Sequence, residues 1–252
     1  MTTSKIPKDR RHHAAFGFVA VTILLVTACA LLWLTSHFLG RGEIQTASGT
    51  NTPDVTIIID AGHGGIDGGT QSRDGLLEKD INLAVANKLY ALCRLAGIDC
   101  RLTRCDDNML VSDDIKQKRK MHDLKNRAAI ADEYVSPVFV SIHMNSYPDS
   151  RYSGLQVWYS KNDERSRSFA SYVQSYAAAY LDPSNTRVIK PATSSIYLLD
   201  RLQVPAILIE CGFLSNENES ALLASDDYQT KLALVIFAAL CEAASDVYKR
   251  QV

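Results

Sequence analysis

The chain has 252 residues, of which 46% are hydrophobic and 22% are charged, and its formal net charge is −1. This hydrophobic content is sufficient for one sizeable buried core, and no internal repeat suggests a second domain of similar size. The nearly balanced charge excludes a general electrostatic attraction to nucleic acid. We therefore expect no nucleic-acid partner.

One long uncharged stretch dominates the N-terminal region. Ala14–Leu39 contains no Lys, Arg, Asp or Glu, and as a helix it would extend about 39 Å, compared with ~30 Å for the hydrocarbon core of a bilayer. Residues 1–13 before it are basic, whereas Arg41 after it is balanced by Glu43. The charge asymmetry predicts a cytoplasmic tail over 1–13 and a single-pass transmembrane helix over 14–39. The remainder of the chain is then extracytoplasmic.

Two other fates of this stretch remain open. A cleaved signal peptide would make the protein secreted, although the apolar core of such a peptide spans only ~7–15 residues. The run VTAC at 26–29 also resembles a lipobox, but mostly apolar residues follow Cys29, where a lipoprotein normally becomes polar. An uncleaved anchor is the favoured interpretation.

The rest of the chain divides into a linker, one domain and a short C-terminal remainder. Residues 40–54 are small and polar and are interrupted by Gly and Pro, which predicts a flexible linker. In residues 55–245, strand-like runs alternate with helical patterns, which predicts a mainly parallel, twisted sheet with helices on both faces. Residues 246–252 contain DVYKRQ, which resembles translated sequencing-adapter sequence, and we predict that they are an artefact. The predicted strands are 55–60, 98–103, 138–142, 155–159 and 206–209, and the predicted helices are 79–96, 114–132, 164–181 and 228–244.

Four residues carry the strongest indication of chemistry. They are His63 in DAGHGG, Glu78 in LLEKD, His143 in VSIHMNS and Glu210 in AILIECGF. Ligands of open α/β sheets bind beyond the carboxyl ends of the strands, which is where both histidines and Glu210 are expected. Zinc hydrolases commonly use two imidazoles and one carboxylate as ligands, with another carboxylate beside the metal as proton carrier. The four residues therefore predict a zinc hydrolase.

Each of these residues also has an ordinary structural interpretation. His63 could be a histidine in a Gly-rich turn, His143 a satisfied core residue, and Glu78 an acid that favours a helix start. Glu210 is more informative, because a carboxylate at the end of an apolar strand needs a cation or a proton nearby. His122 lies in KQKRKMHDLK, where a solvated face is expected, so the other two histidines of the domain remain as the pair that converges on one metal.

The motifs together resemble the zinc-dependent N-acetylmuramoyl-L-alanine amidases of family 3. The matching segments span about Val55–Ala244, and Ala61 stands where that family most often has Pro. Within the family, the chain resembles most the germination-specific amidases of spore formers, which act on spore cortex. The segments are DAGHGGIDGG, EKDINLAVANKLYALCRLAGIDCRLTR, SIHMNS with GLQVWYS, and VPAILIECGFLSNENES.

This resemblance implies a phosphorylase/hydrolase-like α/β fold. It also implies hydrolysis of the amide between N-acetylmuramic acid and L-alanine in peptidoglycan, which would be the substrate. By the same resemblance, His63, Glu78 and His143 are the zinc ligands, and Glu210 is the catalytic acid and base.

Two further residues are candidates for substrate binding. Asn145 follows the His143 motif, and Arg187, in the loop-like segment NTRVIKP, could reach a substrate carboxylate or be an ordinary surface charge. Two alternative functions remain open: a zinc peptidase or deacetylase that acts on another amide, and a non-catalytic, membrane-tethered wall-binding module. Glu210 argues against the binding module, because a binder has little need of a base there.

Overall fold

The computed structural model describes residues 55–112 and 114–249. The predicted cytoplasmic tail, transmembrane helix and linker therefore lie outside the described residues. Within the described ranges, no helix is both long and apolar enough to cross a membrane. These ranges belong to one compact unit.

A six-stranded sheet in the order β2-β1-β3-β6-β4-β5 organises this domain. Strands β2, β1, β3 and β6 are mutually parallel, as predicted, whereas β4 runs antiparallel to β6 and parallel to β5. The antiparallel edge was not predicted; its physical reason is that no helix lies between β3 and β4 to provide the crossover that parallel strands need. The strands are β1 (Thr56–Ala61), β2 (Cys100–Leu102), β3 (Pro137–Asn145), β4 (Gln156–Tyr159), β5 (Lys190–Pro191) and β6 (Ala206–Phe213).

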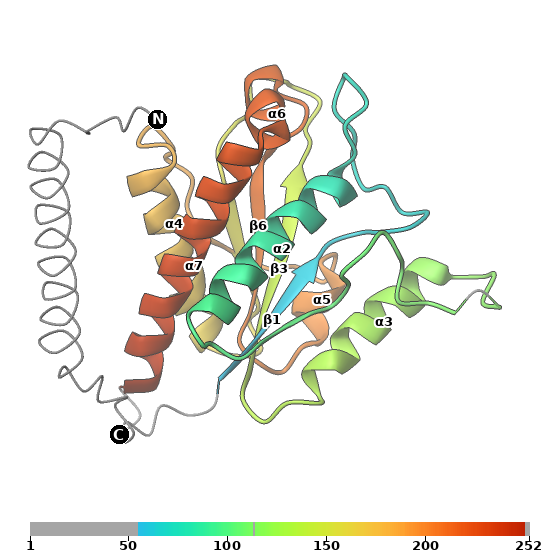
Figure 1. The fold of residues 1–252 in the computed structure, drawn as a ribbon, viewed down its shortest axis with the longest axis vertical. Coiled ribbons are helices and arrows are strands. Elements are labelled where there is room, and N and C mark those ends of the chain that lie inside the picture. The colour runs from blue at the N-terminus through green and yellow to red at the C-terminus, as the bar shows by residue number, and fades with distance from the viewer. Residues whose placement is uncertain (1–54, 113, 250–252) are drawn as a thin grey trace, which may run out of the picture. The chain divides into compact units, whose positions relative to one another are not determined.

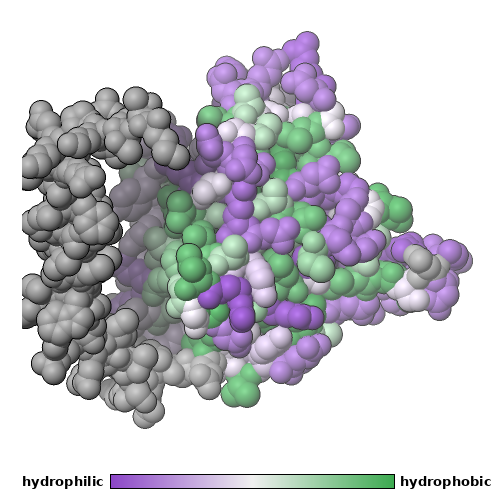
Figure 2. Space-filling model, in the orientation of Figure 1, coloured by the Kyte–Doolittle hydropathy of each residue, from purple (hydrophilic) through white to green (hydrophobic). Residues whose placement is uncertain are grey.

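Helices cover both faces of the sheet (Figure 1). One face carries α2, α4 and α7, with α7 in contact with the other two, and the opposite face carries α3 and α5, which contact each other. Hydrophilic residues concentrate at two projecting ends of the visible surface, around α6 and around the loop before α3 (Figure 2). The helices are α2 (Glu78–Leu95), α3 (Arg119–Ala131), α4 (Arg165–Tyr180), α5 (Tyr197–Arg201), α6 (Glu217–Ala224) and α7 (Asp226–Lys249).

The central strands are apolar on both faces because both faces are covered. In β1, Ile57 and Ile59 pack into the larger core cluster with α2, α4 and α7, whereas Ile58 packs into the smaller cluster with α3 and α5. Successive side chains of a strand point to opposite faces, so a continuous apolar run is what a doubly covered strand requires. The two cores fix the strands rigidly and so position the residues at their carboxyl ends.

Strands β3 and β6 continue beyond the predicted ends at 142 and 209. They reach Asn145 and Phe213, with an irregular register between His143 and Asn145. The prediction stopped where the apolar run stopped, but the length of a strand depends on backbone pairing, and the β3–β6 ladder also pairs polar residues. His143 and Glu210 therefore lie within strands, near their carboxyl ends.

Two helix boundaries also differ from the prediction. The helix predicted from 114 begins only at Arg119, because Lys118 adopts a left-handed conformation with φ 54°. The last helix continues beyond 244 to Lys249 and buries Tyr248. Residues 246–249 thus extend α7, and the predicted artefactual origin of 246–252 stays a prediction.

Candidate active site

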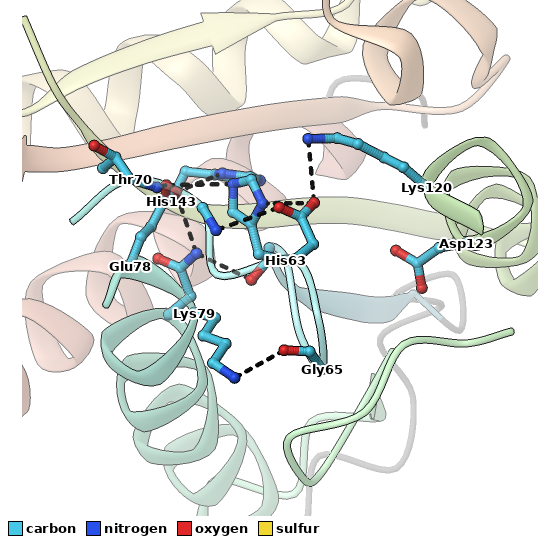
Figure 3. Close-up of polar contacts among 12 residues, drawn as sticks. His63, Gly65, Thr70, Glu78, Lys79, Lys120, Asp123 and His143 are labelled. Carbon is cyan, nitrogen blue, oxygen red and sulfur yellow. Dashed lines mark hydrogen bonds and ion pairs between the residues drawn. The ribbon is translucent and has the colours of Figure 1, made fainter. Parts of the chain in front are cut away.

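His63, Glu78 and His143 meet at the carboxyl edge of the sheet (Figure 3). Each offers one ligand atom, and these atoms all lie within 4.8 Å of one another. The carboxylate of Glu78 lies between the rings: Oε2 is 3.3 Å from Nε2 of His63, and Oε1 is 2.9 Å from Nδ1 of His143. The structure therefore brings together the two imidazoles and the carboxylate that the sequence singled out.

Three different elements supply these side chains, and glycines make room for them. His63 lies two residues after β1, His143 lies in β3, and Glu78 is the first residue of α2. A Cβ atom at Gly62 would lie 2.3 Å from Cε1 and Nε2 of His143, and one at Gly69 would lie 2.4 Å from Oε2 of Glu78. Both distances are far below van der Waals contact, so the Gly-rich motif is needed for the close approach of the three groups.

Hydrogen bonds hold the buried carboxylate of Glu78 in place. The backbone N–H of Thr70 donates to Oε2 at 2.8 Å, and that of Met144 donates to Oε1 at 3.1 Å. Burial by itself raises the pKa of Glu78, but the hydrogen bonds and charges of the two imidazoles outweigh burial and hold the pKa well below its usual range. Glu78 is therefore ionised at neutral pH.

Glu210 lies beside this cluster, and its pKa is shifted in the opposite direction from that of Glu78. It is opposite His143 in the β3–β6 register, and its Oε2 is buried with no hydrogen-bond partner among the residues that the structure describes. Burial raises the pKa of Glu210 to about 7, against the lowering effect of His143, and the negative charge of Glu78 adds to the increase. A carboxyl group with this pKa can both accept and return a proton near neutral pH.

A pocket of about 240 Å³ opens next to the cluster. Its lining includes His63, His143 and Glu210, together with Lys120 of α3 and Tyr197 of α5. Lys120 reaches from α3 toward the His63 loop, where its Nζ is 3.1 Å from Oδ2 of Asp67 (Figure 3). The pocket gives a ligand direct access to both imidazoles and to the raised-pKa carboxyl group.

Sequence reasoning missed Asp67. Its Oδ2 is 3.0 Å from Nδ1 of His63, so the other ring nitrogen, Nε2, faces Glu78. A carboxylate on the far nitrogen of a histidine fixes the orientation of the ring, as in many metal sites. The available signal was the position of Asp67 within the same Gly-rich motif, four residues after His63.

Asn145 and Arg187 lie outside the cluster of His63, Glu78 and His143. Asn145 ends β3, and its side chain accepts a hydrogen bond from the next backbone N–H. Nη1 of Arg187 is 3.3 Å from Oε1 of Gln156, the residue opposite Glu210 on β4. The guanidinium group of Arg187 also lies over the ring of Phe213, 4.6 Å from its centroid. Arg187 thus contacts Gln156, which is the neighbour of Glu210 on the adjacent strand.

Comparison with known proteins identifies the family. The model of a family described as N-acetylmuramoyl-L-alanine amidase matches residues 57–242. The chain belongs to this amidase family. It is 35% identical to the germination-specific N-acetylmuramoyl-L-alanine amidase of Bacillus subtilis (strain 168), over 72% of this chain and 76% of that protein. The chain is therefore an amidase that hydrolyses peptidoglycan, and this confirms the function predicted from the sequence.

Solved structures of this amidase family show the same fold. The CwlD amidase from Clostridioides difficile, solved in complex with the GerS lipoprotein, is 40% identical; the match covers 76% of this chain and 98% of that one, with a TM-score of 0.73. The catalytic domain of CwlV, an N-acetylmuramoyl-L-alanine amidase from Bacillus (Paenibacillus) polymyxa var. colistinus, is 30% identical, with coverage of 74% and 96% and a TM-score of 0.62. The similarity extends over nearly the whole of both solved chains.

Proposed function

We propose that this amidase is a zinc enzyme in which His63, Glu78 and His143 hold the metal and Glu210 carries the proton. The observation that carries the proposal is the contrast between two carboxyl groups, those of Glu78 and Glu210. Glu78 is ionised between two imidazoles, whereas Glu210 has a buried oxygen with no hydrogen-bond partner in the described part of the chain and a pKa raised to about 7. When the environments of two neighbouring carboxyl groups move their pKa values apart in this way, the ionised group is suited to bind the metal. The group with the raised pKa is suited to act as acid and base.

The donor set fits zinc. Two imidazoles and one carboxylate are a common zinc-ligand set in hydrolases, and they leave a fourth position open. Zinc held by these three residues would polarise the amide carbonyl as a Lewis acid and would activate water. Glu210 accepts a proton from the attacking water and returns it to the departing amine of L-alanine. The pocket beside Glu210 holds the lactyl side of the scissile amide within reach of these groups.

We also propose Arg187 and Asn145 as substrate contacts. The guanidinium group of Arg187 is fixed by Gln156 and by the carbonyl of Ser153, at 2.6 Å from Nε, so it is ordered before any ligand arrives. Stem peptides carry carboxylates, and a preordered guanidinium group is suited to bind one. Asn145 ends the strand that carries His143, and this position supports a contact with a neighbouring peptide group.

The cellular setting is a proposal as well. Ala14–Leu39 is long and uncharged, with basic residues before it, which supports a single-pass membrane protein whose catalytic domain is extracytoplasmic. Secretion after signal cleavage is the alternative. The similarity to a germination-specific amidase supports a role in spore cortex maturation.

Metal analysis of the purified protein tests the proposed zinc site. We expect one zinc per chain in the wild type and less than one in His63→Ala and His143→Ala, because each loses a ligand. His122→Ala is a matched control, since His122 lies on α3 outside the cluster. Stoichiometric zinc at unchanged affinity in both ligand variants would remove the proposed site.

A further inference from the structure

Two arginines bind the backbone of the loop that carries His63. The carbonyl of Ala61 accepts from Nε of Arg104 at 2.9 Å and from Nη1 of Arg127 at 2.7 Å. The carbonyl of Gly62 accepts from Nη2 of Arg104 at 3.1 Å, and that of His63 accepts from Nη2 of Arg127 at 2.6 Å. Three consecutive carbonyl groups are thus held by two guanidinium groups.

Both arginines are buried, which is unusual for charged side chains. Arg104, in the loop after β2, is 3% exposed, and Arg127, in α3, is 1% exposed. Burial of a charge is costly unless it is paired and hydrogen-bonded. Arg127 is paired with Asp60 through Nη1 and with Asp123 through Nε, both at 2.7 Å. The forked shape of the guanidinium group lets one side chain reach two carboxylates and two carbonyls at once.

The loop needs this support because its backbone is strained. His63 has φ 62°, in the left-handed region that is unfavourable for any residue with a Cβ atom. Strained conformations persist where the surrounding structure over-determines them. Here the carbonyl of His63 is held by Arg127, and that of Gly65 accepts from Nζ of Lys79 at 2.9 Å (Figure 3).

We propose that Arg104 and Arg127 are positioning residues for the metal site. They hold the His63 loop in its left-handed conformation, so that Nε2 of His63 faces Glu78 before a metal binds. The inference rests on the zinc site proposed above. Groups that orient metal ligands typically contribute 10–100-fold to metal affinity. A purely structural role would instead lower the stability of the fold without a specific effect on the metal site.

Lysine variants of the full chain separate these two roles. Arg127→Lys and Arg104→Lys keep the positive charge but lose the fork, because the donors of lysine radiate from a single nitrogen. Arg165→Lys is the control: Arg165 also forms a fork, with Asp163 at the start of α4, but α4 covers the other face of the sheet. Zinc affinity is measured by competition with a chelator, site geometry by the absorption spectrum of bound Co²⁺, and stability by urea unfolding of the metal-free proteins.

We expect zinc affinity to fall about 10–100-fold in Arg127→Lys and Arg104→Lys, with a changed Co²⁺ spectrum, and to stay unchanged in Arg165→Lys. Affinity within about twofold of the wild type, or a loss fully explained by a larger unfolded fraction, would overturn the proposal. If Arg127→Lys does not fold, Arg104→Lys decides, since Arg104 donates its hydrogen bonds to backbone carbonyls, two of which belong to the His63 loop. A wild-type chain that binds no zinc would instead refute the proposed function itself.

Discussion

His143 and Glu210 are direct neighbours on the parallel strands β3 and β6. The register places an imidazole of the proposed metal site and the proposed proton carrier side by side on two buried, rigid strands. A shift of β6 by one residue would turn Glu210 toward the core formed with α2, α4 and α7. The pairing of β3 with β6 is therefore part of the geometry of the site.

Replacement of Glu210 by glutamine should reduce turnover far more than metal binding. Glu210→Gln is nearly isosteric but cannot accept a proton, and positioned acid–base catalysis typically contributes about 10²–10⁴-fold. We expect a loss of rate of that size, measured by release of peptide amino groups from peptidoglycan, with zinc content unchanged by elemental analysis. Near wild-type turnover would exclude the proton-transfer role, and loss of zinc would make Glu210 a fourth ligand.

The same substitution should alter how the stability of the metal-free protein depends on pH. Because the pKa of folded Glu210 is raised to about 7 from 4.5, its contribution to stability is fully present below pH 4.5 and is lost as pH rises through 7. Glutamine has no charge to bury, so Glu210→Gln should be more stable than the wild type above pH 7, by about 3 kcal/mol. Urea unfolding at pH 4 and pH 8 measures this, and a difference that does not vary with pH would contradict it.

Gly62→Ala should disrupt the site although it adds only one methyl group. Its Cβ would overlap the ring of His143, 2.3 Å from Cε1 and Nε2, so the ring must move. Gly68→Ala is the matched control in the same loop, because its Cβ would meet only Leu77, at 3.4 Å. We expect zinc affinity to fall at least about tenfold in Gly62→Ala and to be retained in Gly68→Ala. Equal affinities in the two variants would show that the site tolerates a Cβ at Gly62.

The location of the catalytic domain can be tested in whole cells. The charges around Ala14–Leu39 predict an uncleaved anchor with the domain outside the membrane. Protease added to intact protoplasts should then digest the domain. Digestion only after lysis would show the opposite orientation, and a mature N-terminus near residue 30 or 40 would support processing.

The side chains that meet at the candidate site were easier to recognise in the sequence than the residues that surround them. His63, Glu78, His143 and Glu210 were recognisable because each has a chemically demanding side chain beside an apolar run or a glycine. Arg127 was not recognisable, because it lies in a polar helix whose charges suggested a solvated face, yet its side chain is buried. Apart from Asp123 in the same helix, its partners are backbone carbonyls and Asp60, more than 60 residues earlier in the chain, and only the tertiary structure brings these together.

The directions and the ends of the strands were predictable only in part, for a similar reason. The four parallel strands follow from apolar runs that alternate with helices, a pattern that is local in the sequence. The antiparallel direction of β4 and the extension of β3 to Asn145 depend on which strand pairs with which. Pairing is set by long-range contacts that the hydrophobic pattern of one segment does not contain.

We propose that this chain cleaves the bond between muramic acid and L-alanine through Glu210 and the His63–Glu78–His143 site. Mass spectrometry of purified peptidoglycan after incubation with the zinc-loaded protein tests it most directly, with Glu210→Gln as the matched inactive control. We predict stem peptides that begin with a free L-alanine amine, glycan strands with free lactyl carboxyl groups, and neither product from the variant. Cleavage within the stem peptide or loss of acetyl groups alone would exclude this reaction, and equal release by Glu210→Gln would exclude the role of Glu210.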